Sequence, residues 1–528
     1  MKIALVAINA KYIHKNLAVR FLKENCDYPT DILEYTIKSD VELIYQELLN
    51  YELIGFSCYI WNIDIITKLC QRIRNNRPSI KILFGGPEVS YEYQEFFDNN
   101  LIDFLIKEEG EQAFNELVSC IVQKKSTENI AGLVTKKQDN PVAKPDLLSI
   151  KLPYKVIENN NLYYLEFTRG CKFKCSYCLA STTNHIRYYD QEAVKAAITE
   201  VVKGGAKMIK FLDRNFTADQ NFAENIFNWL LQFQNYPVSF QFEVNLDLLS
   251  TEYLEKINKN LRPGFFRFEV GIQTLNEKSN KAISRKQNNE KLLENLRLLN
   301  KSNIICHADL ICGLPDDNYH SFIETFNSVL KTKPKELQCG FLKSLKGTKL
   351  RKESAKYGYV FIKEAPYTIV KSNSFSEAEI KSVMKTEEAL EVLYNKNYMP
   401  LTFDFLIESQ DNCFKFLEGF SSNLKKQELD KLFFSFDQYL ETIYPELYAK
   451  AHELLVEDYL RFFKMRPVFW FKEILNKKEK NRLIADLNDF SYSKDFLYRY
   501  AHIAEFTKFY LIVIYNNQES KLIKYWKT

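Results

Sequence analysis

Apolar and polar positions alternate along the first part of this 528-residue chain in a pattern typical of strands separated by helices. Through residues 1–122, short runs rich in β-branched and aromatic residues are separated by amphipathic stretches with helical spacing. The runs are Lys2–Ile8, Ile32–Ile37, Leu53–Cys58, Ile80–Phe84 and Ile102–Leu105. The alternation predicts an α/β domain with a doubly wound, flavodoxin-like or Rossmann-like parallel sheet, whose ligands bind at the carboxyl ends of the strands.

A second strand and helix alternation begins after a polar, irregular segment at 123–160, which we interpret as a linker. Residues 161–350 contain six further apolar runs with helical stretches between them. Six such units predict a partial (βα)6 barrel of the TIM type, with its site at the carboxyl ends of the strands. The runs are Tyr163–Phe167, Met208–Leu212, Val238–Leu246, Phe265–Ile272, Ile304–Cys312 and Glu336–Phe341.

The pattern changes again over residues 351–528, where apolar positions recur at a spacing of three and four residues. We predict a mostly helical C-terminal domain. Its many Phe and Tyr residues would form either a packed aromatic core or a substrate pocket.

Charge and composition exclude several classes of protein. The chain has 72 Lys and Arg against 68 Asp and Glu, so it carries no strong field for nucleic acid. No apolar run approaches the length of a membrane span, and the N-terminus reads directly into a strand without a signal peptide. The eleven cysteines do not form a disulfide framework. We therefore expect a soluble, cytoplasmic protein with reduced thiols.

Three cysteines carry the clearest chemical signal. Cys171, Cys175 and Cys178 form a C-x3-C-x2-C triplet just after the apolar run that ends at Phe167. Three thiolates this close can hold three irons of a [4Fe–4S] cluster and leave the fourth iron open to a small molecule. The alternative, a structural or zinc-binding cluster, lacks a nearby fourth cysteine, although His185 would be able to complete a zinc site.

The triplet resembles that of the radical-SAM superfamily. The resemblance implies that S-adenosylmethionine chelates the open iron and is split to a 5′-deoxyadenosyl radical. Phe268–Thr274 and Asp309–Pro315 match segments common to the cobalamin-dependent members. By this resemblance, the residues expected around adenosylmethionine are Tyr177, Asp213, Glu243, Glu269, Gln273 and Arg285. Each acidic residue among them would otherwise be a helix cap or part of a structural ion pair.

The strand ends of the first domain resemble the cobalamin-binding domain that precedes the barrel in this class. The signature D-x-H-x-x-G is not present, because Tyr12 stands where the Asp would be. His14 is then either a cobalt ligand or a histidine that packs in its loop. The residues implied around cobalamin are His14, Ser57, Cys58, Gly85, Gly86, Glu109 and Gly110.

These features predict a cobalamin-dependent radical-SAM enzyme that methylates an unactivated carbon of a small molecule. Its cofactors would be a [4Fe–4S] cluster, S-adenosylmethionine and cobalamin, and its electrons would come from a flavodoxin-type or ferredoxin-type donor. Three alternatives stay open: a non-methylating oxidation, cyclisation or rearrangement, a cobalamin-responsive or redox-responsive regulator, and an RNA-modifying enzyme. The nearly balanced charge disfavours the last of these.

Overall fold

The computed structural model describes residues 1–528 apart from 155–161, 184, 425–427, 464–466, 468, 472–474, 487–491, 516–519 and 528. The chain folds into two compact units. The first comprises residues 1–322 and 339–380, and the second comprises 323–338 and 381–528. Within the described residues, we find no helix with the length and apolar character needed to span a bilayer.

The first unit begins with a six-stranded sheet in the order β2-β1-β3-β4-β5-β6. Its first five strands pair in parallel, as the alternation predicted, and β6 is antiparallel to β5. The reversal of strand order between β2 and β3 makes the carboxyl ends of β1 and β3 the expected place for a ligand. The strands are β1 (Ile3–Asn9), β2 (Asp31–Thr36), β3 (Leu53–Ser57), β4 (Lys81–Gly85), β5 (Phe104–Ile106) and β6 (Leu133–Val134).

Helices cover both faces of this sheet because its strands alternate between two apolar clusters. One cluster joins Val6 and Ile54 to the buried faces of the second and third helices, and the other joins Leu5 and Leu53 to Phe114 of the fifth. The helices are α1 (Leu17–Glu24), α2 (Val41–Leu48), α3 (Ile63–Asn76), α4 (Gln94–Asp98) and α5 (Glu111–Gln123).

The segment read as a linker contributes to this sheet. Residues 133–134 form β6, which pairs with Ile106 and Leu105 of β5. The sequence pattern missed the strand because two residues are too few to show an alternation. The first sheet is therefore closed by chain beyond residue 122.

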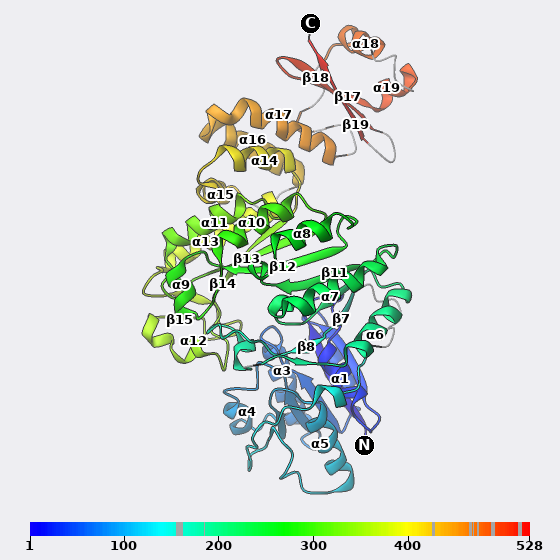
Figure 1. The fold of residues 1–528 in the computed structure, drawn as a ribbon, viewed down its shortest axis with the longest axis vertical. Coiled ribbons are helices and arrows are strands. Elements are labelled where there is room, and N and C mark those ends of the chain that lie inside the picture. The colour runs from blue at the N-terminus through cyan, green and yellow to red at the C-terminus, as the bar shows by residue number, and fades with distance from the viewer. Residues whose placement is uncertain are drawn as a thin grey trace. The chain divides into compact units, whose positions relative to one another are not determined.

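Another six-stranded sheet is the predicted partial barrel, with strand order β14-β13-β12-β11-β10-β7. Its pairs from β7 through β13 are parallel, and its helices run beside the strands (Figure 1). The strands are β7 (Leu162–Leu165), β10 (Met208–Phe211), β11 (Ser239–Val244), β12 (Phe266–Gln273), β13 (Ile305–Cys312) and β14 (Glu336–Phe341). The helices are α6 (Gln191–Lys203), α7 (Gln220–Leu230), α8 (Thr251–Asn258), α9 (Glu277–Ala282), α10 (Asn289–Asn300) and α11 (Tyr319–Leu330).

Short antiparallel elements complete the first unit. A ribbon of β8 (Thr168–Arg169) and β9 (Arg187–Tyr188) brackets the cysteine triplet, and β15 (Val360–Phe361) pairs with β16 (Ile369–Lys371). Along the chain, α12 (Lys349–Lys352) lies between β14 and β15.

The second unit is helical in its larger part, as predicted, but it ends in an antiparallel sheet that the sequence pattern did not reveal. The order of that sheet is β17-β18-β19, and Figure 1 shows it beside two short helices. Its central strand, β18 (Phe509–Tyr515), is an apolar run of seven residues. The helices are α13 (Glu377–Leu390), α14 (Pro400–Ser409), α15 (Cys413–Ser421), α16 (Leu429–Ile443), α17 (Pro445–Phe462), α18 (Lys477–Asp486) and α19 (Lys494–Tyr500), and the other strands are β17 (Ala501–Glu505) and β19 (Ser520–Trp526).

Candidate functional site

The three cysteines of the triplet lie in the loop between β8 and β9, at the carboxyl end of β7. Gly170 begins this loop with a φ of 94°, and a Cβ at this position would collide with the carbonyl oxygen of His185. Glycine is required there because the two ends of the loop approach each other so closely. The loop is tied to its surroundings by Ser176, whose N–H donates to Ile283 at 2.9 Å and whose carbonyl accepts from Leu350 at 2.9 Å.

Cys171, Cys175 and Cys178 line a cavity of about 300 Å³, here called the cysteine cavity. Within the described part of the chain, no three His, Cys, Asp or Glu side chains converge on a single point that a lone metal ion would occupy. A [4Fe–4S] cluster does not need such convergence, because each thiolate binds a different iron. Burial raises the pKa of Cys171 and Cys178, so iron binding would have to displace their protons. The triplet therefore fits a cluster better than a single zinc ion.

The cysteine cavity extends from the cluster loop to the carboxyl ends of four barrel strands. Five of the six residues predicted to hold adenosylmethionine lie on its wall: Tyr177, Glu243, Glu269, Gln273 and Arg285. Ser181, Arg214, Asn215, Asn245 and Asp309 add further polar side chains to the wall. The strand register brings these residues together from positions far apart in the sequence.

Two of these side chains retain unused capacity for a ligand. The Oε1 atom of Gln273 is buried and accepts no hydrogen bond. The guanidinium of Arg285 donates to the carbonyl of Gly271, to Oε1 of Gln287 at 2.9 Å and, at 3.5 Å, to Oδ1 of Asn245, and no carboxylate among the described residues forms an ion pair with it. A wall with an unused acceptor and a cation that is not paired with a carboxylate suits the amino and carboxylate groups of an amino acid.

Glu243 stands on the same wall, and no hydrogen bond or ion pair from the described residues holds its carboxyl group. Burial raises its pKa, although the nearby Arg214 opposes the shift. A buried carboxyl group with no donor to bind it is costly when ionised, so a ligand with hydroxyl or ammonium donors would be favoured beside it.

Glu269 lines the cysteine cavity, but side chains of two other strands already donate hydrogen bonds to its carboxylate. Lys210 of β10 donates to its two oxygens at 2.7 and 2.9 Å, and Gln241 of β11 donates to one of them. Glu269 therefore forms part of the cavity floor, and it would have to leave Lys210 to bind a ligand strongly.

Asp213 lies outside the cysteine cavity, in contrast to its expected role. Its carboxyl is 1% exposed and accepts hydrogen bonds from the N–H of Phe167 and from the hydroxyl of Thr168 at 2.6 Å. Burial raises the pKa of Asp213 to about 7. The sequence placed it at a strand end correctly, but the side chain turns into the protein to fix the backbone that leads into the cysteine loop.

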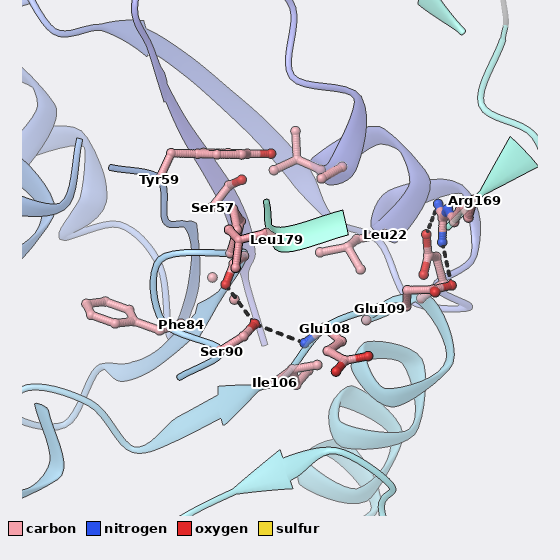
Figure 2. Close-up of a pocket in the computed structure, with 18 of the residues that line it drawn as sticks. Leu22, Ser57, Tyr59, Phe84, Ser90, Ile106, Glu108, Glu109, Arg169 and Leu179 are labelled. Atoms are coloured by element: carbon pink, nitrogen blue, oxygen red, sulfur yellow. Dashed lines mark hydrogen bonds and ion pairs between the residues drawn. The ribbon is translucent and has the colours of Figure 1, made fainter. Parts of the chain in front are cut away.

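A second cavity, of about 370 Å³, lies at the carboxyl ends of the first sheet and is here called the sheet-edge cavity. Figure 2 shows its wall of apolar side chains and backbone, with Ser57, Tyr59 and Leu179 on it. Five of the seven residues predicted to surround cobalamin line it: Ser57, Gly85, Gly86, Glu109 and Gly110. The cysteine loop supplies the opposite wall, through Leu179, Ala180, Thr182 and Thr183.

The other two predicted residues lie elsewhere. The side chain of Cys58 is fully buried in the core of the first sheet, and its thiol faces the carbonyl of Phe56. His14 is not on the cavity wall, because Nδ1 of its ring is hydrogen-bonded to the hydroxyl of Tyr164 on β7. In this position the ring of His14 lies against the barrel, away from the sheet-edge cavity.

Glycines at the sheet edge allow backbone to form this wall. A Cβ at Gly85 would meet only the carbonyl oxygen of Ile106, at 3.8 Å, so a larger side chain would extend into free space. At Gly86, φ is 108° and a Cβ would lie 2.6 Å from the carbonyl oxygen of Cys58. Ser90 fixes the loop, since its hydroxyl donates to the carbonyl of Gly86 at 2.9 Å and accepts from the N–H of Glu108 at 3.0 Å (Figure 2). Such an open, largely apolar cleft with a glycine edge fits a large flat cofactor.

Arg169 connects the two cavities. Its guanidinium donates to Glu109 at 3.0 Å, to Glu111 at 2.6 Å and to Glu166 at 2.8 Å, and Glu109 also accepts from Arg187. Burial alone would lower the pKa of Arg169, but the carboxylates of Glu166 and Glu111 raise it on balance. The residue just before the cysteine loop is thereby fixed to the loop that lines the sheet-edge cavity.

The two cavities also share part of their walls. Arg214 and Ala180 line both of them. No hydrogen bond or ion pair holds the exposed guanidinium of Arg214 within the described residues. A ligand in one cavity would therefore lie next to a ligand in the other, with the exposed cation of Arg214 at the border.

Sequence reasoning missed the side chains that connect the parts. Arg169, Ser90 and Lys210 were not predicted, because each acts through a partner far away in the sequence. The position of Arg169, directly before Gly170 and Cys171, was the available signal.

Comparison with known proteins assigns families to three segments. Residues 3–118 match the family described as B12 binding domain, and residues 165–329 match the Radical SAM superfamily. Residues 355–519 match a protein family of unknown function, DUF4080.

Curated relatives of the chain are distant. It is 23% identical to the cobalamin-dependent radical SAM methyltransferase TokK of Streptomyces tokunonensis, over 53% of this chain and 45% of that protein. It is 21% identical to an anaerobic magnesium-protoporphyrin IX monomethyl ester cyclase of Synechocystis sp., over 54% of this chain and 60% of the cyclase. The chain thus spans about half the length of the curated relatives it matches.

Among solved structures, the fold is similar to that of the cobalamin-dependent S-adenosylmethionine radical enzyme OxsB with aqua-cobalamin bound. The TM-score is 0.59 at 14% identity, covering 87% of this chain and 80% of that one. The predicted fold class, a doubly wound parallel sheet followed by a partial barrel and a helical C-terminal region, is confirmed.

Proposed function

We propose that this chain, which belongs to the B12-binding and radical-SAM families through its first two domains, is a cobalamin-dependent radical-SAM methyltransferase acting on a small molecule. The observation that carries the proposal is the border between the two cavities. The cysteine cavity and the sheet-edge cavity meet at Arg214 and Ala180. Methyl transfer between two cofactors requires them to be adjacent in this way.

The residues that would hold each group follow from the site. Cys171, Cys175 and Cys178 would hold the cluster, and the glycine edge at Gly85 and Gly86 would face cobalamin. When bound, the cluster would supply the electron that cleaves adenosylmethionine to a 5′-deoxyadenosyl radical, and cobalamin would carry the methyl group.

The protein's own part is to bind, orient and exclude water. Gln273 offers a buried free acceptor and Arg285 a cation to the amino acid end of adenosylmethionine. Tyr177, next to Cys178 and on the same wall, would pack beside the adenine. The walls limit access of solvent to a reactive radical.

The proposed partners are a small-molecule substrate and an external one-electron donor of the flavodoxin or ferredoxin type. Lys172 and Lys174 are exposed in the cysteine loop, where an acidic donor protein would approach the cluster. No disulfide joins any of the eleven cysteines, which supports a reducing, cytoplasmic location.

The proposal is tested by anaerobic reconstitution with iron, sulfide and cobalamin. The expected result is about four iron atoms and one cobalamin per chain, with 5′-deoxyadenosine formed from adenosylmethionine on reduction. The triple variant Cys171→Ala, Cys175→Ala, Cys178→Ala should lose the iron and this product but retain cobalamin. Iron retained by the triple variant would contradict the assignment.

A non-methylating reaction is the second candidate, because the cyclase is among the relatives. The same assay separates the two. The second candidate predicts 5′-deoxyadenosine without methyl transfer to cobalamin, and a regulator would form neither product.

A further inference from the structure

The interior of the barrel carries charged side chains where a closed barrel usually carries branched apolar ones. On β12, Phe266 and Phe268 pack outward, with ring centroids 5.5 Å from that of Phe227 on α7. Because side chains alternate along a strand, Arg267 and Glu269 face the interior. The partly exposed state of both positions agrees with a space that is not filled by the protein itself.

These interior side chains occupy two adjacent levels of the strand register. Lys210, Gln241 and Arg267 occupy one level of the strand register, and Glu269 and His307 occupy the level nearer the carboxyl ends. Lys210 and Gln241 both donate to Glu269, and Nη2 of Arg267 lies 3.0 Å from Nε2 of His307. Lys210 and Gln241 thus reach the floor of the cysteine cavity through Glu269, and Arg267 lies beside Gln241 in the strand register.

The charges on this level do not balance. Glu269 is neutralised by Lys210. Arg267 has no carboxylate within ion-pair distance in the described residues, and its Nε is buried without an acceptor. A guanidinium has five donors, so most of its hydrogen-bonding capacity is left for a ligand. Its planar fork matches carboxylate and phosphate groups.

The first domain contributes one side chain to this interior. The loop after β1 places His14 against the hydroxyl of Tyr164, which occupies the same register level as Lys210. Burial lowers the pKa of His14, and Lys11 and Lys210 lower it further. A neutral imidazole at this point adds a polar group without adding charge.

We propose that the barrel interior beneath the cysteine cavity binds a substrate that carries an anionic group, a carboxylate or a phosphate, and that Arg267 holds this group. The substrate would thereby be oriented with its other end toward the cysteine cavity. The inference rests on the proposed function for the identity of the molecule as substrate.

Saturation-transfer NMR on the full-length holoenzyme tests the inference. The cluster is kept in its oxidised, diamagnetic state, and adenosylmethionine is bound so that the cations of the cysteine cavity are not accessible to the probes. The probes are succinate and methyl phosphate, with neutral succinamide and cationic 1,4-diaminobutane for comparison. We expect signals from one or both anions, at least about fivefold above those of the other two probes. The stronger anion assigns the group as carboxylate or phosphate.

Variants locate the site. Arg267→Gln should abolish the anion signal, Arg267→Lys should keep part of it, and Arg297→Gln, at an exposed position on α10, should leave it unchanged. Iron content and circular dichroism verify that each variant is folded. If Arg267→Gln does not fold, Arg267→Lys still tests the site. An anion signal in Arg267→Lys that equals that of the original protein, or that is no stronger than the signal of succinamide, would count against a specific guanidinium site.

Anions that bind no better than succinamide, or that bind Arg267→Gln as well as the original protein, would overturn the inference. The assay is independent of catalysis. Anion binding without 5′-deoxyadenosine formation contradicts the proposed function alone, and 5′-deoxyadenosine formation without anion binding contradicts the substrate class alone.

Discussion

The guanidinium of Arg169 donates a 3.0 Å hydrogen bond to Glu109 and so joins the cysteine loop to the edge of the first sheet. Glu111 and Glu166 share the same guanidinium. Because the cation is buried among three carboxylates, the geometry of one cavity depends on that of the other.

Arg169→Gln should weaken both cofactor sites. The substitution leaves buried carboxylates without their cation, which typically costs about 3–5 kcal/mol. We expect a lower melting temperature and loss of both iron and cobalamin, measured by metal analysis and absorption. The control is Arg20→Gln, which breaks the 2.7 Å pair with Glu34 in the same domain, away from the cysteine loop. Equal cobalamin and iron contents in the two variants would show that Arg169 does not couple the sites.

Gly85→Leu should abolish cobalamin binding without unfolding the protein. A Cβ at Gly85 has only one neighbour, at 3.8 Å, so a leucine would extend into the sheet-edge cavity. Gly85→Ala, which adds a single methyl group, should retain binding. Titration with hydroxocobalamin measures both variants, and iron content reports on the cysteine loop. Normal cobalamin affinity in Gly85→Leu would place the cofactor elsewhere.

Gln273→Ala should weaken adenosylmethionine binding while leaving the cluster intact. A single neutral hydrogen bond is worth about 0.5–1.5 kcal/mol, or roughly a 2- to 10-fold rise in Kd. Equilibrium dialysis measures the change, and iron analysis verifies the cluster. Gln232→Ala, at an exposed position, is the control. An unchanged Kd in Gln273→Ala would mean that its free Oε1 does not meet the ligand.

Asp213 should make stability depend on pH. Its pKa is raised to about 7 in the folded protein by burial, against about 3.9 in an unfolded chain. Between these values the folded protein holds a proton that the unfolded chain has lost, so the free energy of unfolding falls as pH rises from about 4 to about 7. The full change is about 4 kcal/mol, from roughly three pKa units.

Asp213→Asn should remove this slope. Melting temperatures of the cofactor-free protein between pH 4.5 and 8 measure it, with Asp190→Asn, an exposed helix cap, as control. The control should keep the slope of the original protein. Parallel pH profiles for Asp213→Asn and the original protein would contradict the raised pKa.

The strands were predictable because their apolar runs are long and regularly spaced. The bounds of β14 agree with the sequence pattern residue for residue, and those of β3 and β13 differ by one. The two-residue strand β6 was not predicted, because so short a strand shows no alternation of apolar and polar residues. The terminal sheet of β17–β19 was not predicted either, because its strands resemble isolated apolar runs in the sequence.

For the site, the sequence predicted which strand ends carry polar groups but not the directions of their side chains. Gln273 and Glu243 line the cysteine cavity, whereas Asp213 turns inward to its own backbone and His14 turns to Tyr164. Glu269 lies on the wall, yet Lys210 occupies its carboxylate. Such choices depend on partners that are distant in sequence, as with Arg169 and Glu109.

The border of the two cavities at Arg214 and Ala180 is most directly tested by following the methyl group of adenosylmethionine. Reduced, reconstituted enzyme is incubated without substrate with cobalamin and adenosylmethionine labelled with ¹³C in its methyl group, and the cobalamin and nucleosides are analysed by mass spectrometry. We predict cobalamin that carries the labelled methyl group, together with 5′-deoxyadenosine. Unlabelled cobalamin and intact adenosylmethionine, in protein with a full cluster and bound cobalamin, would contradict it.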